Sequence, residues 1–211
     1  MGKIFDIDGP VMRFFAKIGD LILINLLFLI CSIPVVTAGA SAVSMYTLTM
    51  RLVRREERTR TVRSFFAAFR ENFRRATAIW GIFLGVGLVL AVNYWLMTFN
   101  PDIYPILMRV LIFCLTFIYV MCLTWVFPMY ARFENKVTDT VRNSLAMGIS
   151  YIGVTVPAMG LTVLPAILLY YKTAFFLKTA VFWLFIGFAL TSYLKSFHGC
   201  QFSVSLYGLP N

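Results

Sequence analysis

Long runs without a charged residue make up most of the chain, and the charged residues collect in the short segments between them. A helix needs about 20 apolar residues to cross the ~30 Å hydrocarbon core of a bilayer. The runs are rich in Leu, Ile, Val and Phe without a two-residue alternation, which excludes the strands of an outer-membrane barrel. The uncharged runs are Leu21–Met50, Ala76–Pro101, Val110–Ala131, Asn143–Tyr171 and Thr179–Leu194.

The first of these runs is too long for one straight crossing and contains two helix-disturbing residues. Pro34 removes a backbone donor and clashes with the preceding turn, and Gly39 loosens the chain again. We therefore predict a hairpin, with a bend through Pro34–Gly39 acting as a structural hinge between two helices. A single span followed by a re-entrant half-helix is the alternative. In either case the bend must be buried in protein or face water, because lipid cannot satisfy its backbone groups.

Together the runs predict an all-α, polytopic integral membrane bundle of about six helices, forming a single domain over residues 1–211. Pro157 and Pro165 are expected to kink the fourth run, and Pro128 is expected to end the third run near the interface. The predicted helices cover about 11–33, 40–55, 77–99, 107–131, 145–170 and 176–194.

The segment from residue 51 to residue 75 holds nine arginines against three glutamates. Its phenylalanines recur at helical spacing as one stripe, which predicts an amphipathic interfacial helix over about 62–75. Such a helix lies in the membrane plane, with its rings in the acyl boundary and its guanidinium groups at lipid phosphates. A docking surface for another protein is the alternative. The candidate lipid-binding or partner-binding residues here are Arg51, Arg54, Arg55, Phe65, Phe66, Phe69, Asn72, Phe73, Arg74 and Arg75.

The distribution of basic residues predicts the orientation of the bundle. With six helices and both termini in the cytoplasm, sixteen of the nineteen lysines and arginines lie inside, and Arg109, Lys172 and Lys178 lie outside. With a re-entrant half-helix in place of the hairpin, the inside count falls to thirteen. The positive-inside rule therefore favours the hairpin, and it places the arginine-rich segment in the cytoplasm either way.

Composition supports a membrane protein and argues against nucleic acid as its partner. Apolar residues make up 60% of the 211 residues and charged residues only 13%, against about 25% charged in soluble domains. The formal net charge of +10 comes from basic residues that flank the apolar runs, so we do not expect nucleic acid as a partner.

The sequence offers no set of residues for catalysis or for holding a metal or cofactor. His198 is the only histidine, and the four cysteines have no CxxC spacing. All nine carboxylates fall outside the predicted spans, whereas proton-coupled carriers bury ionisable groups along their pathway. We therefore predict a protein that is not an enzyme and has no cofactor.

Several stretches of the chain resemble the YesL-like family, a group of Gram-positive bacterial membrane proteins with a domain of unknown function. The resemblance covers about residues 5–146, and the last third agrees mainly in hydrophobic pattern. The stretches that carry it are NLLFLICSIPVVTAG (25–39), MY (45–46), RLVRRE (51–56), SFFAAFRENFRRATAIW (64–80), FPMYARFEN (127–135) and RNS (142–144).

Members of that family commonly occur beside carbohydrate ABC importers, so the resemblance implies an accessory protein of oligosaccharide uptake in the bacterial cell membrane. An importer permease or its ATPase is then the expected partner, together with membrane lipids. Pro128, Arg132, Phe133 and Asn135 begin a loop on the same side as the arginine-rich segment. We expect both to form one basic, aromatic docking surface; alternatively, this loop only caps helices and binds lipid headgroups.

A different function remains open on the sequence alone. The chain could be an independent small-solute transporter or channel whose path lies near the Pro34–Gly39 break. Asn25 and Asn93, the amides inside predicted spans, would then line that path. Amides in such positions more often make hydrogen bonds between helices.

Overall fold

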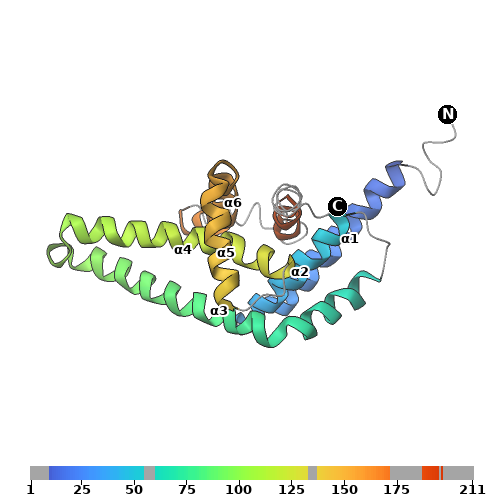
Figure 1. Cartoon of the computed structure of the whole chain (residues 1–211), viewed down its shortest axis with the longest axis horizontal. Coiled ribbons are helices and arrows are strands. Elements are labelled where there is room, and N and C mark those ends of the chain that lie inside the picture. The colour runs from blue at the N-terminus through green and yellow to red at the C-terminus, as the bar shows by residue number, and fades with distance from the viewer. Residues whose placement is uncertain (1–9, 55–59, 133–136, 172–186, 195, 197–211) are drawn as a thin grey trace.

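The computed structural model describes residues 10–54, 60–132, 137–171, 187–194 and 196. Within these residues the chain is helical and has no strands, so the predicted all-α fold class is confirmed. Figure 1 shows an elongated molecule in which a long helical hairpin projects from a cluster of shorter helices. The elements are α1 (Pro10–Ser32), η1 (Val35–Thr37), α2 (Ala38–Val53), α3 (Thr61–Phe99), η2 (Pro101–Ile103), α4 (Ile106–Arg132), α5 (Val137–Ser150) and α6 (Ile152–Tyr171).

Helices α1 and α2 are joined by a turn at the predicted place, and this turn is shorter than expected. Whether both helices cross the membrane stays a prediction. Pro34 precedes the 3-10 turn η1, and the Thr37 hydroxyl oxygen lies 2.8 Å from the Pro34 carbonyl oxygen. Gly39, predicted to be part of the bend, instead lies inside α2 and is buried. Its role is close packing, because a Cβ at this position would lie 2.7 Å from the Ala76 carbonyl oxygen of α3. The turn therefore excludes Gly39, because it ends at Thr37. A hinge role for Pro34 stays a prediction.

The predicted interfacial helix at 62–75 and the predicted span at 77–99 are one continuous helix, α3. Its 39 residues correspond to a length of about 58 Å at 1.5 Å per residue. No glycine or proline occurs between Thr61 and Trp80, so nothing in the backbone ends the helix where the charge pattern changes. In Figure 1, α3 bends along its length but does not break. The prediction of two separate helices is wrong for this reason.

Helix α4 runs antiparallel to the second half of α3 and returns to the charged end of the molecule (Figure 1). Pro128 lies inside α4 and is buried, and the helix continues for four more residues to Arg132. The expectation that Pro128 ends this helix is therefore wrong. A proline removes one backbone hydrogen bond, and here the following turn still forms.

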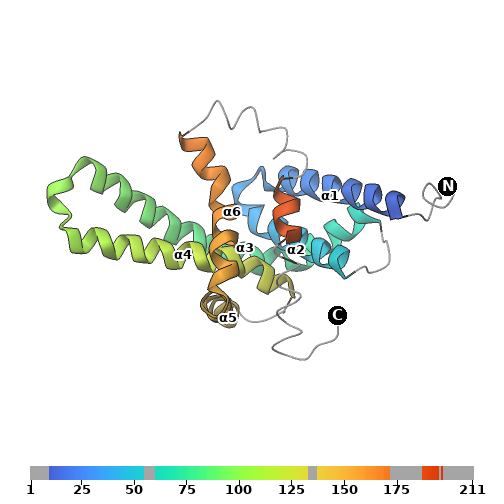
Figure 2. The ribbon, with the colours of Figure 1, turned by 90° about the horizontal axis from the view of Figure 1, so that it is seen from above.

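The predicted helix at 145–170 is divided into α5 and α6 at Tyr151. Figure 2 shows α5 end-on, whereas α6 lies in the plane of the page and runs upward, so the chain turns sharply between them. The Thr155 hydroxyl bridges the turn: it lies 3.0 Å from the Gly148 carbonyl oxygen and accepts a bond from the Trp125 indole N–H at 3.1 Å. The sequence predicted a kink at Pro157. The bend instead lies before this residue, at Tyr151. Of the predicted helix at 176–194, residues 187–194 are helical and the rest lie outside the described residues.

Buried residues gather around α2, which packs against α1, α3 and α4. Val43, Phe65 and Val126 come from three of these helices and are fully buried. Polar contacts join helices far apart in the chain: the buried Asn25 Oδ1 accepts the Ala189 backbone N–H at 2.9 Å. Such internal bonds are what apolar surroundings require of buried polar groups.

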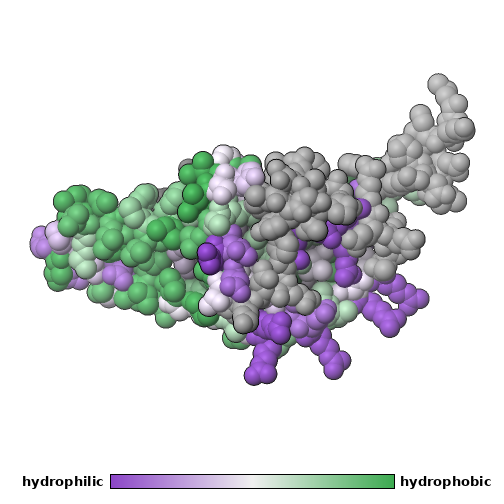
Figure 3. Space-filling model, viewed as in Figure 1, coloured by the Kyte–Doolittle hydropathy of each residue, from purple (hydrophilic) through white to green (hydrophobic). Residues whose placement is uncertain are grey.

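The projecting hairpin, which consists of the second half of α3 and most of α4, exposes apolar side chains on most of its surface (Figure 3). Among the described residues, three helices are long and apolar enough to cross a membrane: α1 over Phe15–Ser32, α3 and α4. The chain is therefore a membrane protein. Helix α2, with 16 residues and a length of about 24 Å, is shorter than a full crossing. The number of crossings and the side on which each terminus lies stay predictions.

Candidate functional site

A cavity of about 930 Å³ opens where α2, α3 and α4 meet at the charged end of the molecule. Five arginines and one glutamate contribute its charged side chains, and we call it the arginine cavity. Its lining residues are Thr47, Met50, Arg51, Arg54, Arg60, Arg63, Ser64, Ala67, Ala68, Glu71, Asn72, Tyr130, Ala131 and Arg132.

Helical spacing explains why these residues share one cavity. On α3, Arg60, Ser64, Ala67 and Glu71 follow one another by four, three and four residues, so they lie along one face. On α2, Thr47, Arg51 and Arg54 repeat the same pattern. The two rows meet because α2 runs antiparallel to the first half of α3.

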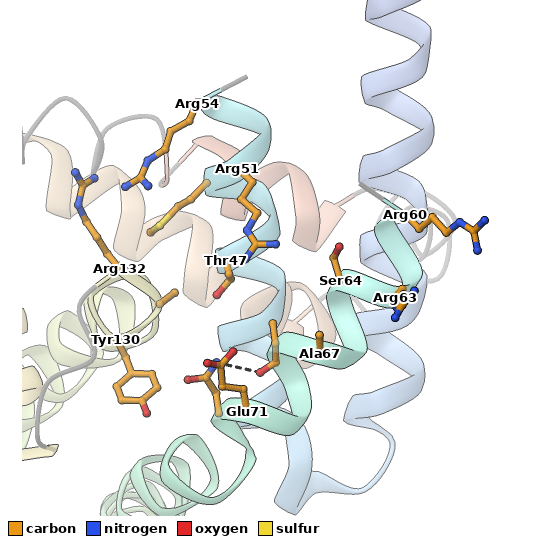
Figure 4. A pocket seen from close by; sticks show the side chains of 14 residues that line it. Thr47, Arg51, Arg54, Arg60, Arg63, Ser64, Ala67, Glu71, Tyr130 and Arg132 are labelled. Atoms are coloured by element: carbon orange, nitrogen blue, oxygen red, sulfur yellow. Dashed lines mark hydrogen bonds between the residues drawn. The ribbon is translucent and has the colours of Figure 1, made fainter. Parts of the chain in front are cut away.

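Arg54 and Arg132 reach toward one another from α2 and α4 in Figure 4, and Arg51 projects from α2 below Arg54. Glu71 lies lower in the same view, on the α3 side, and Arg60 and Arg63 lie at the far edge, on the first turns of α3. The Asn72 side-chain amide donates to the Ala68 carbonyl at 2.9 Å and so is tied to its own helix. Two guanidinium groups, those of Arg54 and Arg132, therefore lie at the part of the cavity nearest α4, and the Arg51 side chain points away from this pair.

The electrostatic character of the cavity follows from its lining. Among the described residues that line the cavity, five arginines accompany one carboxylate, that of Glu71. The Arg60 side chain is directed away from the other four in Figure 4. Four of the five arginines are exposed, and Arg132 is half-buried. The described lining is thus mostly exposed and predominantly basic, a combination that favours anions.

The structure brings together only some of the predicted site residues. Arg51, Arg54, Asn72 and Arg132 line the arginine cavity. Three other predicted residues are not exposed as a docking surface requires: Phe65 and Pro128 are buried, and Phe69 is half-buried. Arg55, Phe133 and Asn135 lie outside the described residues. Whether any of these residues binds lipid or a partner stays a prediction.

The predicted single docking surface divides into two flanks of α3. Phe66 and Phe73 are exposed and seven residues apart, so they share one side of the helix. Ser64 of the cavity precedes Phe66 by two residues, a rotation of about 200°. The phenylalanine flank therefore lies opposite the arginine cavity. Arg74 and Arg75 are exposed and lie outside the cavity lining.

Sequence reasoning missed Arg60, Arg63 and Glu71 as cavity residues. Their helical register with Ser64 and Ala67 was visible in the sequence. The phenylalanine stripe dominated the interpretation of this segment, and its guanidinium groups were expected at lipid phosphates or on a docking surface. The part played by Tyr130 depends on the return of α4 to this end, which local spacing does not reveal.

The features expected of a transport path have structural explanations here. The bend is closed against α3, since the Trp80 indole N–H donates to the Val35 carbonyl at 2.7 Å. Asn25 accepts a bond from the Ala189 backbone, and Asn93 donates to the Val89 carbonyl of its own helix. Among the described residues, no group of three or more His, Cys, Asp or Glu side chains gathers to hold a metal. The transporter alternative and the absence of enzymatic activity stay predictions.

Residues 21–94 match the model of a family described as "Protein of unknown function, DUF624". The match runs from the start of the apolar part of α1 through most of α3 and so includes two of the three walls of the arginine cavity. No curated protein and no solved structure matches the chain. Over these residues, the chain is thus similar to the DUF624 family.

Proposed function

We propose that this protein is an accessory integral membrane protein of a bacterial carbohydrate-uptake system, which binds an ABC importer and stabilises or regulates it. The support for the importer is the resemblance of the sequence to the YesL-like family, whose members carry the DUF624 domain that residues 21–94 match. The permease and the ATPase of the importer are the proposed partners, in the plasma membrane.

The observation that carries a docking role is the phenylalanine flank of α3. Phe66 is 48% exposed and Phe73 is 40% exposed, on the half of the helix that also bears Arg70 and Arg74. Phenylalanine and arginine are among the residues enriched in the buried cores of protein interfaces. Membrane lipids are the other partner that such a flank can take.

Orientation decides what this flank can reach. The first half of α3 bears Arg63, Arg70, Arg74 and Arg75, and the positive-inside rule places such a segment in the cytoplasm. With both termini also inside, as proposed, the flank lies level with the cytoplasmic loops of a permease and with its ATPase. The function therefore depends on the cytoplasmic end of the molecule and not on its apolar hairpin.

Affinity purification of the tagged chain from its native membranes in a mild detergent tests the proposal. Importer permease and ATPase are expected in the eluate, quantified by mass spectrometry. Replacing Phe66 and Phe73 by alanine is expected to lower their recovery at least fivefold. The matched control is Val86→Ala with Val92→Ala, because these residues are equally exposed on the apolar half of the same helix. Recovery of neither importer subunit with the unaltered chain would contradict the proposal.

A further inference from the structure

We propose that the arginine cavity is a binding site for phosphate groups, supplied either by a soluble phosphorylated molecule or by the headgroup of an anionic phospholipid. This site is distinct from the phenylalanine flank, which lies on the opposite side of α3. The protein would therefore have two separate sites, the phenylalanine flank for docking and the arginine cavity for a small anion.

The first argument is the convergence of guanidinium groups. Arg54 and Arg132 approach each other from different helices (Figure 4), and Arg51 lies one helical turn before Arg54. The planar guanidinium presents paired N–H donors that match two oxygens of a phosphate. A phosphate monoester carries up to three acceptor oxygens and nearly two charges, so it can engage several arginines together.

The second argument is the polar lining that surrounds these arginines. The Thr47 hydroxyl donates to the Val43 carbonyl of its own helix at 2.9 Å, so it does not contribute a donor to an anion. Ser64 and Tyr130 add hydroxyl groups from α3 and α4. Among the described lining residues, Glu71 is the one carboxylate, and its charge disfavours an anion on the α3 side of the cavity. The walls are therefore built for a compact anion at the end nearest α4.

The third argument is shape. The cavity is a concave space between three helices, and its volume of about 930 Å³ falls within the ~300–1,000 Å³ of small-molecule sites. An acidic protein segment would be expected on a more open surface, such as the exposed Arg70 and Arg74 side of α3. The cavity therefore favours a small phosphorylated ligand or headgroup over a protein segment.

The position of the cavity in the membrane allows both sources of phosphate. Helix α4 has 27 residues, a length of about 40 Å, which exceeds the ~30 Å hydrocarbon core. Tyr130 and Arg132 at its end are therefore at the level of headgroups when the start of α4 lies at the opposite interface. A lipid headgroup and a cytoplasmic solute can each reach this level.

Thermal unfolding of the purified full-length chain in a neutral detergent tests the soluble source, with inorganic pyrophosphate as the probe. Pyrophosphate is expected to raise Tm more than sodium chloride at equal ionic strength. Arg54→Gln and Arg132→Gln are expected to weaken the apparent affinity at least tenfold, and Arg54→Lys to weaken it less because the charge remains. The matched controls are Arg70→Gln and Arg74→Gln, which remove the same charge outside the cavity.

The lipid source is tested in nanodiscs of phosphatidylcholine with and without phosphatidylglycerol. If the headgroup is the ligand, phosphatidylglycerol raises Tm and the gain disappears in Arg54→Gln and Arg132→Gln but not in the controls. The inference is overturned if neither pyrophosphate nor phosphatidylglycerol raises Tm beyond the salt control. It is also overturned if the control variants weaken binding as much as the cavity variants, or if poly-glutamate competes as well as pyrophosphate. Importer recovery is measured separately through Phe66 and Phe73, so either proposal can fail alone.

Discussion

Gly39 lies directly against Trp80, so closely that a Cβ on the glycine would lie 2.5 Å from the Cβ of the tryptophan. The Ala76 carbonyl oxygen lies at 2.7 Å from the same point. Because backbone atoms cannot move aside as a flexible side chain does, α2 can approach α3 this closely only with glycine at this position. The Trp80 indole then reaches the Val35 carbonyl and fixes the α1–α2 turn onto α3.

Gly39→Ala should therefore destabilise the protein by separating α2 from α3. We expect a cost of about 1–3 kcal/mol, the range for overpacking a well-packed core, measured by thermal unfolding in detergent. Gly19→Ala is the control, because a Cβ on this α1 glycine meets nothing within 4 Å. Unchanged Tm for Gly39→Ala would show that the two helices are not packed as described.

Asn25→Ala should lower stability because it leaves the Ala189 backbone N–H without its acceptor in a buried place. A buried donor deprived of its partner costs about 1–3 kcal/mol. Asn93→Ala is the matched control, since Asn93 is only partly buried and bonds to its own helix. Equal losses of Tm for the two variants would contradict a special role for the contact between α1 and the 187–194 helix.

The continuity of α3 can be tested at Ala78, an exposed residue at the point where the sequence favoured a break. Ala78→Pro should cost about 3 kcal/mol or more, and Ala78→Gly about 1 kcal/mol, if the helix passes through this position. The free energies of unfolding of both variants and of the unaltered chain, measured side by side, check these two values. A proline as mild as the glycine here would support two separate helices.

The sequence patterns identified which segments are helical, but they misplaced several helix ends and located only the α1–α2 turn closely. Pro34 marked the α1–α2 turn because the loss of a backbone donor acts locally. The boundary between charged and uncharged residues near Ala76 marked a change of surroundings, which a helix can pass without ending. The break at Tyr151 depends on the Thr155 hydroxyl and the Trp125 indole, and their contact is tertiary.

The candidate site was predictable only in part for the same reason. The distribution of lysines and arginines placed Arg51, Arg54 and Arg132 together on the cytoplasmic side of the membrane, so Arg132 was expected on the same side as the arginine-rich segment. The sequence did not predict that α4 continues past Pro128, so that Arg132 lies at the end of a helix and not in a loop. Phe65 belonged to the predicted stripe, yet it is fully buried because its side of α3 faces α2 and the core.

The sidedness of the molecule is the claim on which both proposals depend. Single cysteines at Arg70 and at Asp102, in a chain whose four native cysteines are replaced by alanine, can be labelled with a membrane-impermeant maleimide. Arg70 lies on the charged half of α3, and Asp102 lies in η2 at the far end of the apolar hairpin. We predict that D102C reacts in intact cells and that R70C reacts only after permeabilisation. Labelling of R70C in intact cells, or of both cysteines from the same side, would contradict a cytoplasmic arginine cavity.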